Sequence, residues 1–255
     1  MAMKSIHPGR LLAVVLLAGC TRAAAPAVAT PVPIAVAATR SPEEERLHTD
    51  WPWLARYRAA NAALGAPRAG EQRVVFMGNS ITEGWAPHFA EQFPGKPYVG
   101  RGISGQTTPQ MLVRFRQDVI DLHPAAVVIL GGTNDVAGNT GPATLEMIQG
   151  NLASMAELAR ANGIRVVLVS VLPVYEYRWR PAIKPAETIV ALNAWLREYA
   201  RTHEAVYLDL HSAMADERQG LRKELTADGV HPNDAGYRVM SPLAALAIAE
   251  ALRLR

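Results

Sequence analysis

Val127-Val128-Ile129-Leu130 and Val166-Val167-Leu168-Val169 are two runs of consecutive apolar residues, most of them β-branched. A strand that is apolar at successive positions is buried on both faces, which is typical of the central strands of a parallel sheet. With their neighbours, the two runs predict strands over residues 126–130 and 165–171. Because helices must cover both faces of such a sheet, these runs favour an α/β fold.

The rest of the chain alternates between strand-like and helix-like segments. Shorter β-branched runs predict three further strands, and the stretches between strands have helical periodicity or begin with proline. The additional strands are expected over residues 73–77, 97–99 and 206–210, and the helices over residues 85–92, 109–120, 142–162 and 187–203. This alternation predicts a parallel sheet with helices on both faces.

Additional helices are expected at the two ends of this pattern. Ser41 followed by proline is typical of a helix start, and a second helix is predicted from Pro52 to Gly65. The last helix is expected to begin near Asn233 and to be kinked or restarted at Pro242.

The composition is that of an ordinary globular protein. The chain has 255 residues, of which 49% are apolar and 19% charged, enough for one domain with a sizeable core. The formal net charge of +3 includes Lys4 and Arg10, so removal of the first nineteen residues would leave +1. No basic stripe with interleaved aromatics is present in the sequence, and a nucleic-acid partner is therefore not predicted.

The first residues have the features of a targeting segment. Lys4 and Arg10 precede a short apolar run, residues 11–18, that is too short to span a bilayer and is typical of a secretory signal. The run ends in Leu17-Ala18-Gly19-Cys20, which resembles a bacterial lipobox. That resemblance implies a signal peptide over residues 1–19 and lipidation of Cys20, with an ordinary signal peptide as the alternative. The protein would then be exported and held at a membrane, facing the periplasm or the cell exterior.

Residues 20–40 are rich in alanine and proline and predict an extended tether rather than a folded element. Residues 41–255 are expected to form a single domain. Cys20 is the one cysteine in the sequence, so no disulfide can form within the chain.

A candidate nucleophile follows the first predicted strand, in Gly78-Asn79-Ser80-Ile81-Thr82-Glu83-Gly84. The carboxyl ends of strands form the binding crevice of α/β sheets, so a serine at this point is exposed to a substrate. Near the other end of the chain, Asp228 and His231 are spaced so that the acid can orient the imidazole as a general base. The alternatives are ordinary: a serine that caps a helix and an aspartate in a helix-entry turn.

Two glycine-rich segments each follow a predicted strand. Gly102 can present a backbone N–H to a developing oxyanion without a side chain in the way, and Asn134 can supply a side-chain amide. The first segment also contains Gly100, Gly102 and Gly105 in the spacing of a dinucleotide-binding fingerprint. The strand before it is short and begins with proline, which makes dinucleotide binding the weaker interpretation.

Taken in order, Gly78-Asn79-Ser80-Ile81, Gly102, Gly132-Thr133-Asn134-Asp135 and Asp228-Gly229-Val230-His231 resemble the four sequence blocks of the SGNH (GDSL) hydrolases. The resemblance covers roughly residues 73–248. It implies a flavodoxin-like three-layer α/β/α sandwich around a mostly five-stranded parallel sheet, and hydrolysis of carboxylic esters without a cofactor.

The resemblance also implies roles for individual residues. Ser80 would be the nucleophile, His231 the general base and Asp228 its orienting acid. The oxyanion hole would consist of the Ser80 and Gly102 backbone N–H groups and the Asn134 amide. Asn79 stands where the family has aspartate, and Gly100 stands where many members have asparagine. No grouping of ligands has metal-binding spacing, and no metal is predicted.

The loop expected after the fourth strand is rich in aromatic residues and arginine, and it would overhang the crevice. Candidate substrate contacts are Trp85, Tyr175, Tyr177, Trp179 and Arg180. Aromatic faces suit sugar rings, so the preferred substrate is a short acyl ester, above all acetyl, of a carbohydrate or similar small molecule. The alternatives are a lysophospholipase or thioesterase, an O-acyltransferase with the same triad, and a non-catalytic binding lipoprotein. The sequence gives no indication of oligomeric state.

Overall fold

The computed structural model describes residues 40–254, in which five strands form one sheet. All pairings between neighbouring strands are parallel, and the strand order is β2-β1-β3-β4-β5. The strands are β1 (Val74–Gly78), β2 (Tyr98–Gly102), β3 (Ala126–Leu130), β4 (Arg165–Val169) and β5 (Val206–Leu208). This is the order of flavodoxin-like sheets, and the predicted α/β fold with a five-stranded parallel sheet is confirmed.

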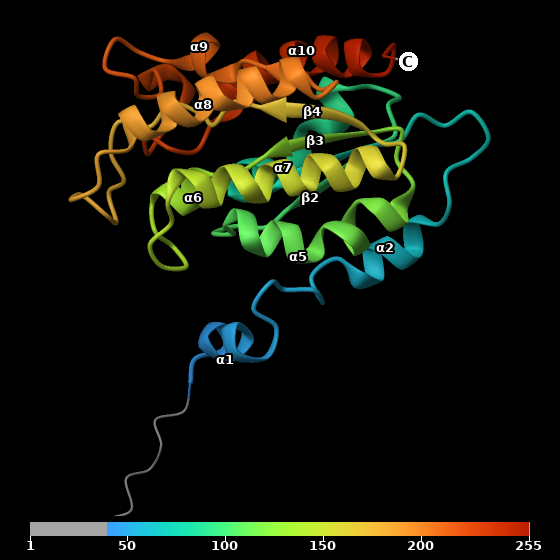
Figure 1. The fold of residues 1–255 in the computed structure, drawn as a ribbon, viewed down its shortest axis with the longest axis horizontal. Helices are drawn as coiled ribbons and strands as arrows, with labels where there is room; N and C mark the ends of the chain where they lie inside the picture. Colours follow the sequence, from blue (N-terminus) through green and yellow to red (C-terminus); the bar gives the residue numbers. More distant parts are fainter. Residues whose placement is uncertain (1–39, 255) are drawn as a thin grey trace, which may run out of the picture. The chain divides into compact units, whose positions relative to one another are not determined.

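Helices cover both faces of the sheet (Figure 1). One face is covered by α5 (Thr108–Asp118), α7 (Leu145–Ala161) and α8 (Pro185–Thr202). The other is covered by α3 (Ser80–Trp85), α4 (Phe89–Gln92), α9 (Leu210–Met214) and α10 (Asp234–Ala251). The remaining helical segments are α1 (Pro42–Thr49), α2 (Arg58–Leu64), α6 (Thr133–Val136), η1 (Ala86–His88), η2 (Ile120–Leu122) and η3 (Lys223–Leu225).

The hydrophobic core is divided in two by the sheet. Along β1, Val75 and Met77 pack with one layer of helices, whereas Val74 and Phe76 pack with the other. This division follows from the alternation of side chains along a strand. All five residues of β1 and of β3 are buried, so these strands have no polar side, as the apolar run over residues 127–130 predicted for β3.

Several element boundaries differ from the expectations. The second strand does not stop at Val99 but continues to Gly102, because residues 100–102 pair with Phe76, Met77 and Gly78 of β1. Gly100 and Gly102 therefore lie within a strand and not in a loop that leads into a helix. This geometry does not support the dinucleotide-binding interpretation, which requires the glycines at a strand-to-helix turn.

The N-terminal part of the described chain is only partly as expected. Ser41 caps α1 and forms a reciprocal capping box with Glu44. Between Pro52 and Gly65, only α2 is α-helical.

The last helix, α10, runs as one helix through Pro242 instead of restarting there. The predicted signal peptide, the tether except for Arg40, and Cys20 lie outside the described residues. Of the helices within residues 40–254, none is both long and apolar enough to cross a bilayer.

The strands all run in the same direction, but the side of the sheet on which successive strands are added changes at β1. After β1 the chain forms β2 on one side, and it then crosses over to β3 on the other side of β1. A topological switch point of this kind leaves a crevice at the carboxyl ends of the strands, where α/β proteins bind ligands. Ser80, Gly102 and Asn134 all lie at or just beyond the carboxyl ends of β1, β2 and β3.

Candidate active site

Ser80 is the first residue of α3 and follows β1 after a very short connection. Asn79 is the N-cap, and its side-chain oxygen accepts a hydrogen bond from the backbone N–H of Ile81 at 3.1 Å. The aspartate that the family has at this position would accept the same hydrogen bond through a carboxylate oxygen, so the change to asparagine preserves the N-cap of α3. Gly78 is required by space, since a Cβ atom there would lie 2.1 Å from Oγ1 of Thr82. The serine is thereby held at a tight strand-to-helix turn rather than in a loop.

The structure brings Ser80, His231 and Asp228 into a hydrogen-bonded row. The distance between Ser80 Oγ and His231 Nε2 is 2.9 Å, and that between His231 Nδ1 and Asp228 Oδ2 is 2.7 Å. The row joins residues separated by about 150 positions in sequence, since Ser80 begins α3 and His231 lies on the loop before α10. The side chains of His231 and Asp228 are 40% and 41% exposed, so the imidazole is accessible to a substrate.

The loop holds Asp228 through its second carboxylate oxygen. Oδ1 accepts hydrogen bonds from the backbone N–H groups of Val230 at 2.9 Å and His231 at 2.8 Å. Burial alone would raise the pKa of Asp228, but the hydrogen bonds from His231 and Val230 lower that pKa to about 2. The carboxylate is therefore ionised at any pH at which a histidine base can work, and it can stabilise an imidazolium.

The two candidate oxyanion residues flank Ser80. Gly102 ends β2 against the first turn of α3, where a Cβ atom would lie only 2.1 Å from the backbone nitrogen of Glu83. The carbonyl oxygen of Gly102 accepts a hydrogen bond from the Tyr57 hydroxyl, which fixes this peptide from the other side. Asn134 lies in the short helix α6 and is 5% exposed.

One proton of the Asn134 amide is already engaged. Its Nδ2 donates to the carbonyl oxygen of Gln106 at 2.9 Å, and an amide nitrogen carries two protons. The hydrogen bond to Gln106 therefore orients the amide while it leaves a second donor for a substrate oxygen. This arrangement fits an oxyanion hole, in which donors must be fixed before charge develops.

A buried arginine connects these parts, and the sequence interpretation missed it. Arg114 of α5 is 0% exposed; it donates to Gln106 Oε1 at 2.6 Å, to the Gly78 carbonyl oxygen at 2.8 Å and to Asp118 Oδ2 at 3.0 Å. It thus holds both the turn before Ser80 and the residue that orients Asn134. A sequence signal was present, because Arg114 and Asp118 are four residues apart on a helix face that also carries buried Met111 and Phe115.

Two of the expected substrate contacts lie in the protein interior. Trp85 is 0% exposed; it packs edge-on against Phe76, and its Nε1 donates to Ser241 Oγ at 2.9 Å. Tyr177 is also 0% exposed, and its hydroxyl lies 2.8 Å from Oγ1 of Thr133. Neither side chain can touch a substrate. Tyr177 instead holds the start of α6 beside Asn134, and burial raises its pKa to about 12.

The other expected contacts are on the surface. Tyr175 and Trp179 are 45% and 46% exposed, and Arg180 is also exposed. Tyr175 lines a cavity beside Asp228, whereas Arg180 lines a different cavity beside Gly105. The loop after β4 therefore contributes to two depressions, of which the one at Tyr175 is also lined by Asp228 of the triad. Within residues 40–254, no three His, Cys, Asp or Glu side chains are grouped to hold a metal ion.

A doubly covered parallel sheet with serine, histidine and aspartate in hydrogen-bond contact at its switch point defines a class of protein, the α/β serine hydrolases. Within that class the sequence is specific. Residues 76–239 match the GDSL-like Lipase/Acylhydrolase family, and the chain belongs to this family. It is a carboxylic ester hydrolase.

Individual relatives agree with this assignment. A solved GDSL-like lipase from Bacteroides thetaiotaomicron is 48% identical, with a TM-score of 0.76 over 79% of this chain and 100% of that one. Esterase TesA of Pseudomonas aeruginosa is 29% identical over 65% of this chain and 82% of its own length. An acetylxylan esterase of Xylanibacter ruminicola is 25% identical over 73% of this chain and 45% of its own length.

Proposed function

We propose that this esterase removes short acyl groups, above all acetyl, from carbohydrates or similar small alcohols through an acyl-enzyme intermediate. The observation that carries the proposal is the row from Ser80 through His231 to Asp228, with heavy-atom distances of 2.9 and 2.7 Å. These distances are within hydrogen-bond reach, which a general base needs to activate a serine.

The proposed mechanism has two acyl-transfer steps. His231 Nε2 takes the proton of Ser80 as Oγ attacks the acyl carbon, and the oxyanion that forms is stabilised by the Asn134 amide and the Gly102 and Ser80 backbone N–H groups. Collapse of this intermediate breaks the ester bond, and His231 gives the proton to the departing alcohol oxygen. Water then attacks the acyl-enzyme by the same route and releases the acid.

Two observations support a short acyl group on a sugar-like alcohol. One relative is an acetylxylan esterase, although the matched region is less than half of that protein. The exposed aromatic faces of Tyr175 and Trp179 are suitable for contact with sugar rings. The alternatives to this proposal are hydrolysis of a lysophospholipid, hydrolysis of a thioester, and transfer of the acyl group to a sugar alcohol instead of water. The experiment below distinguishes them from the proposal.

The test is hydrolysis of p-nitrophenyl esters of increasing acyl length by the wild type and by Ser80→Ala. We expect the highest kcat/KM with the acetyl ester and no acyl-enzyme formation in Ser80→Ala. A fluorophosphonate probe should label the wild type and not the variant. Labelling of a folded Ser80→Ala protein would contradict the nucleophile assignment, and a maximum at long acyl chains would contradict the acetyl preference. Product analysis with added sugar alcohols would show whether acyl transfer competes with hydrolysis.

We also propose that the mature protein is a lipoprotein anchored through Cys20 and exported from the cytoplasm. The support is in the sequence: a positively charged start, a short apolar run and Leu17-Ala18-Gly19-Cys20. In this arrangement residues 20–40 would connect the anchor to the hydrolase domain, proposed to span residues 41–255.

A further inference from the structure

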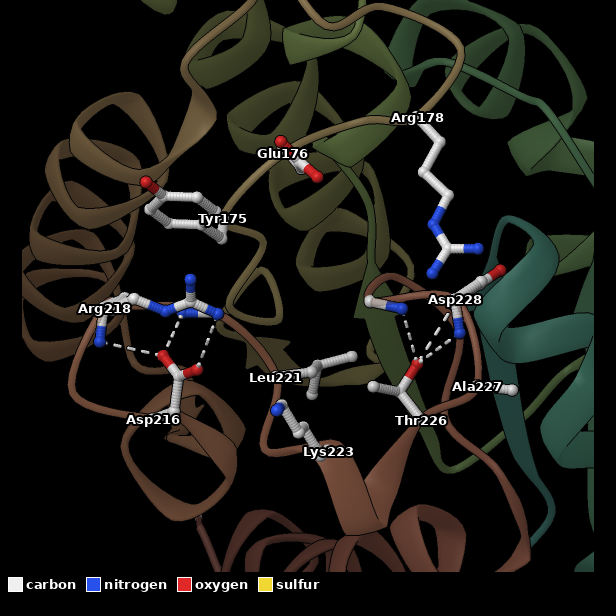
Figure 2. Close-up of a pocket in the computed structure, with 12 residues that line it drawn as sticks. Tyr175, Glu176, Arg178, Asp216, Arg218, Leu221, Lys223, Thr226, Ala227 and Asp228 are labelled. Atoms are coloured by element: carbon white, nitrogen blue, oxygen red, sulfur yellow. Dashed lines mark hydrogen bonds and ion pairs between the residues drawn. The ribbon is translucent and has the colours of Figure 1, made fainter.

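A cavity of about 380 Å³ is lined by Asp228 of the triad and by residues of the loops around it. One side of the cavity is formed by Thr226 and Asp228, on the loop before α10, and the other side is formed by Tyr175 and Arg218 (Figure 2). The volume falls within the range of about 300–1,000 Å³ that is usual for small-molecule sites.

The chemistry of the proposed reaction determines which part of a substrate can reach this cavity. His231 Nε2 protonates the departing alcohol oxygen, so the alcohol part of the ester must lie against the imidazole. Asp228 binds the opposite ring nitrogen at 2.7 Å and lines the cavity. With the acyl oxygen towards Gly102 and Asn134, an alcohol part long enough to pass the imidazole of His231 would reach this cavity on the Asp228 side. This step rests on the proposed function.

One wall of the cavity is built in advance. Asp216 Oδ1 accepts hydrogen bonds from the backbone N–H groups of Arg218 at 2.8 Å and Gly220 at 2.9 Å. The Arg218 guanidinium lies 4.6 Å from the centre of the Tyr175 ring and 3.8 Å from Asp216. Gly220 leaves room for this packing, since a Cβ there would lie 3.0 Å from the Cβ of Tyr175. The charge of Arg218 is thus compensated within the wall.

Three other charged side chains that line the cavity are not compensated. Within residues 40–254, Arg178, Lys223 and Glu176 have no hydrogen-bond or ion-pair partner, and all three are exposed. Figure 2 shows Arg178 extending from the loop after β4 towards the side of the cavity formed by Asp228. Asp228 also carries a negative charge, but both of its carboxylate oxygens already accept hydrogen bonds from the loop that carries it. The charged groups left free to bind a ligand are therefore two cations, Arg178 and Lys223, and one anion, Glu176.

We propose that this cavity binds a carboxylate on the alcohol part of the substrate, so that the preferred ester is an acylated acidic sugar. Arg178 would contact the carboxylate, and Lys223 would contribute a second positive charge. The planar guanidinium matches a carboxylate with two parallel hydrogen bonds. A polar, charged lining beside one exposed aromatic ring fits a sugar better than an acyl chain. Arg178 is then a specificity-determining residue, whereas the negative charges of Glu176 and Asp228 lower the preference for an anion.

The test uses a pair of acetyl esters that differ in charge and little else, 3-acetoxybenzoate and methyl 3-acetoxybenzoate. We expect Arg178→Gln to lower kcat/KM for the anionic ester about tenfold or more, as for loss of one charge-assisted hydrogen bond, and to leave the neutral ester unchanged. Lys223→Gln should act in the same direction, and Glu176→Gln should raise kcat/KM for the anionic ester. Because exposed charges are screened, added salt should reduce the wild-type preference.

A matched control is Lys184→Gln, which removes a cation from the same β4–α8 connection. Lys184 is exposed at the N-cap of α8 and is not part of this cavity, so the variant should leave both kcat/KM values unchanged. Equal effects of Arg178→Gln on the two esters, or none on either, would overturn the proposal while hydrolysis of the methyl ester would still support the esterase function. Failure of the wild type on both esters and on p-nitrophenyl acetate would instead reject the esterase function itself.

Two further substrate comparisons distinguish a sugar carboxylate from other anions. Acetylated oligosaccharides that contain a uronic acid should be deacetylated faster than acetylated xylo-oligosaccharides, and Arg178→Gln should abolish this difference. A stronger response to 3-acetoxyphenyl phosphate than to 3-acetoxybenzoate would show that the cavity prefers a phosphate and would overturn the carboxylate assignment.

Discussion

Asn134 shows how a single side chain can be held ready for a transition state. Its Nδ2 donates to Gln106, and Gln106 in turn accepts a hydrogen bond from buried Arg114. The amide therefore loses no orientational freedom when a substrate oxygen becomes charged, and this is the condition under which an oxyanion donor is most effective.

We expect Asn134→Ala to fold and to lower kcat by about 10² to 10³, the usual effect of removing one oxyanion donor. The measurement is steady-state hydrolysis of p-nitrophenyl acetate, with circular dichroism to establish that the variant is folded. Asn151→Ala is the control, because it removes another amide donor, to Thr108 Oγ1 at 3.0 Å, that has no assigned role in the oxyanion hole. A folded Asn134→Ala enzyme with wild-type kcat would contradict the oxyanion assignment.

Asp135, the next residue, should make the stability of the protein depend on pH. Burial raises its pKa from 3.8 to about 6, although its carboxylate accepts hydrogen bonds from the backbone N–H and the hydroxyl of Thr108. Between about pH 4 and pH 6 the folded state keeps a proton that the unfolded chain has lost. The free energy of unfolding therefore falls as the pH rises through this window.

Asp135→Asn has no titratable proton and should not show this fall. Relative to the variant, the wild type should lose up to about 3 kcal/mol of unfolding free energy between about pH 4 and pH 7. Urea denaturation of both proteins at the two pH values measures the change. The same wild-type-to-variant difference at both pH values would show that folding does not raise the pKa of Asp135.

The chemistry-bearing residues were predicted from the sequence, whereas the residues that hold them, Arg114 above all, were not. Ser80, Asp228 and His231 each stand in a short local pattern beside a glycine, and the structure brings all three together. Trp85 is also near Ser80 in sequence, but α3 turns its side chain into the core. Proximity in sequence cannot tell which of the two side chains is buried. Ser80 is the first residue of α3 and Trp85 is its last, so the two side chains face different surroundings.

At the scale of elements, the strands were predicted better than the helix starts. The predicted bounds of β3 are those of the structure, because a strand buried on both faces is an uninterrupted run of apolar residues in the sequence. The end of β2 was missed, since Gly100 and Gly102 carry no strand propensity and are held there only by pairing with β1. The start of α7 was expected at Pro142, but Thr144 is the N-cap.

Helix α5 is the element that joins the oxyanion side of the site to the Ser80 turn, through Arg114. Arg114→Met would leave Asp118, also 0% exposed, without its charge partner. We expect this to lower the free energy of unfolding by about 3–5 kcal/mol, as measured by urea denaturation. In the double variant Arg114→Met/Asp118→Leu, part of the loss should be recovered, because no unpaired buried charge remains.

Arg116→Met is the matched control on the same helix. Its guanidinium is 65% exposed and lies 4.0 Å from Asp121, so its loss should cost less than about 1 kcal/mol. If Arg114→Met were as stable as Arg116→Met, the buried ion pair would not be what fixes α5 against the site.

At the scale of the whole molecule, the site exists because strands β1, β2 and β3 are neighbours in the order β2-β1-β3. The alternation of apolar runs and helical stretches predicts a parallel sheet, but it does not by itself determine strand order, which depends on crossovers between distant segments. The order was available only through the resemblance to the SGNH hydrolases. Once the order is known, Gly102 and Asn134 must flank Ser80.

The same scale includes the proposed membrane anchor, which the reaction does not require. The two hydrophobic clusters described and the Ser80–His231–Asp228 row lie within residues 40–254. A variant of the full chain with Cys20→Ala should therefore keep the wild-type kcat/KM on p-nitrophenyl acetate while it loses its place in the membrane fraction. The wild type should incorporate labelled palmitate and sediment with membranes. Each CH₂ group of the attached acyl chains that enters the bilayer adds about 0.8 kcal/mol to the free energy of membrane binding. A Cys20→Ala protein that still sedimented with membranes would place the attachment elsewhere in the chain.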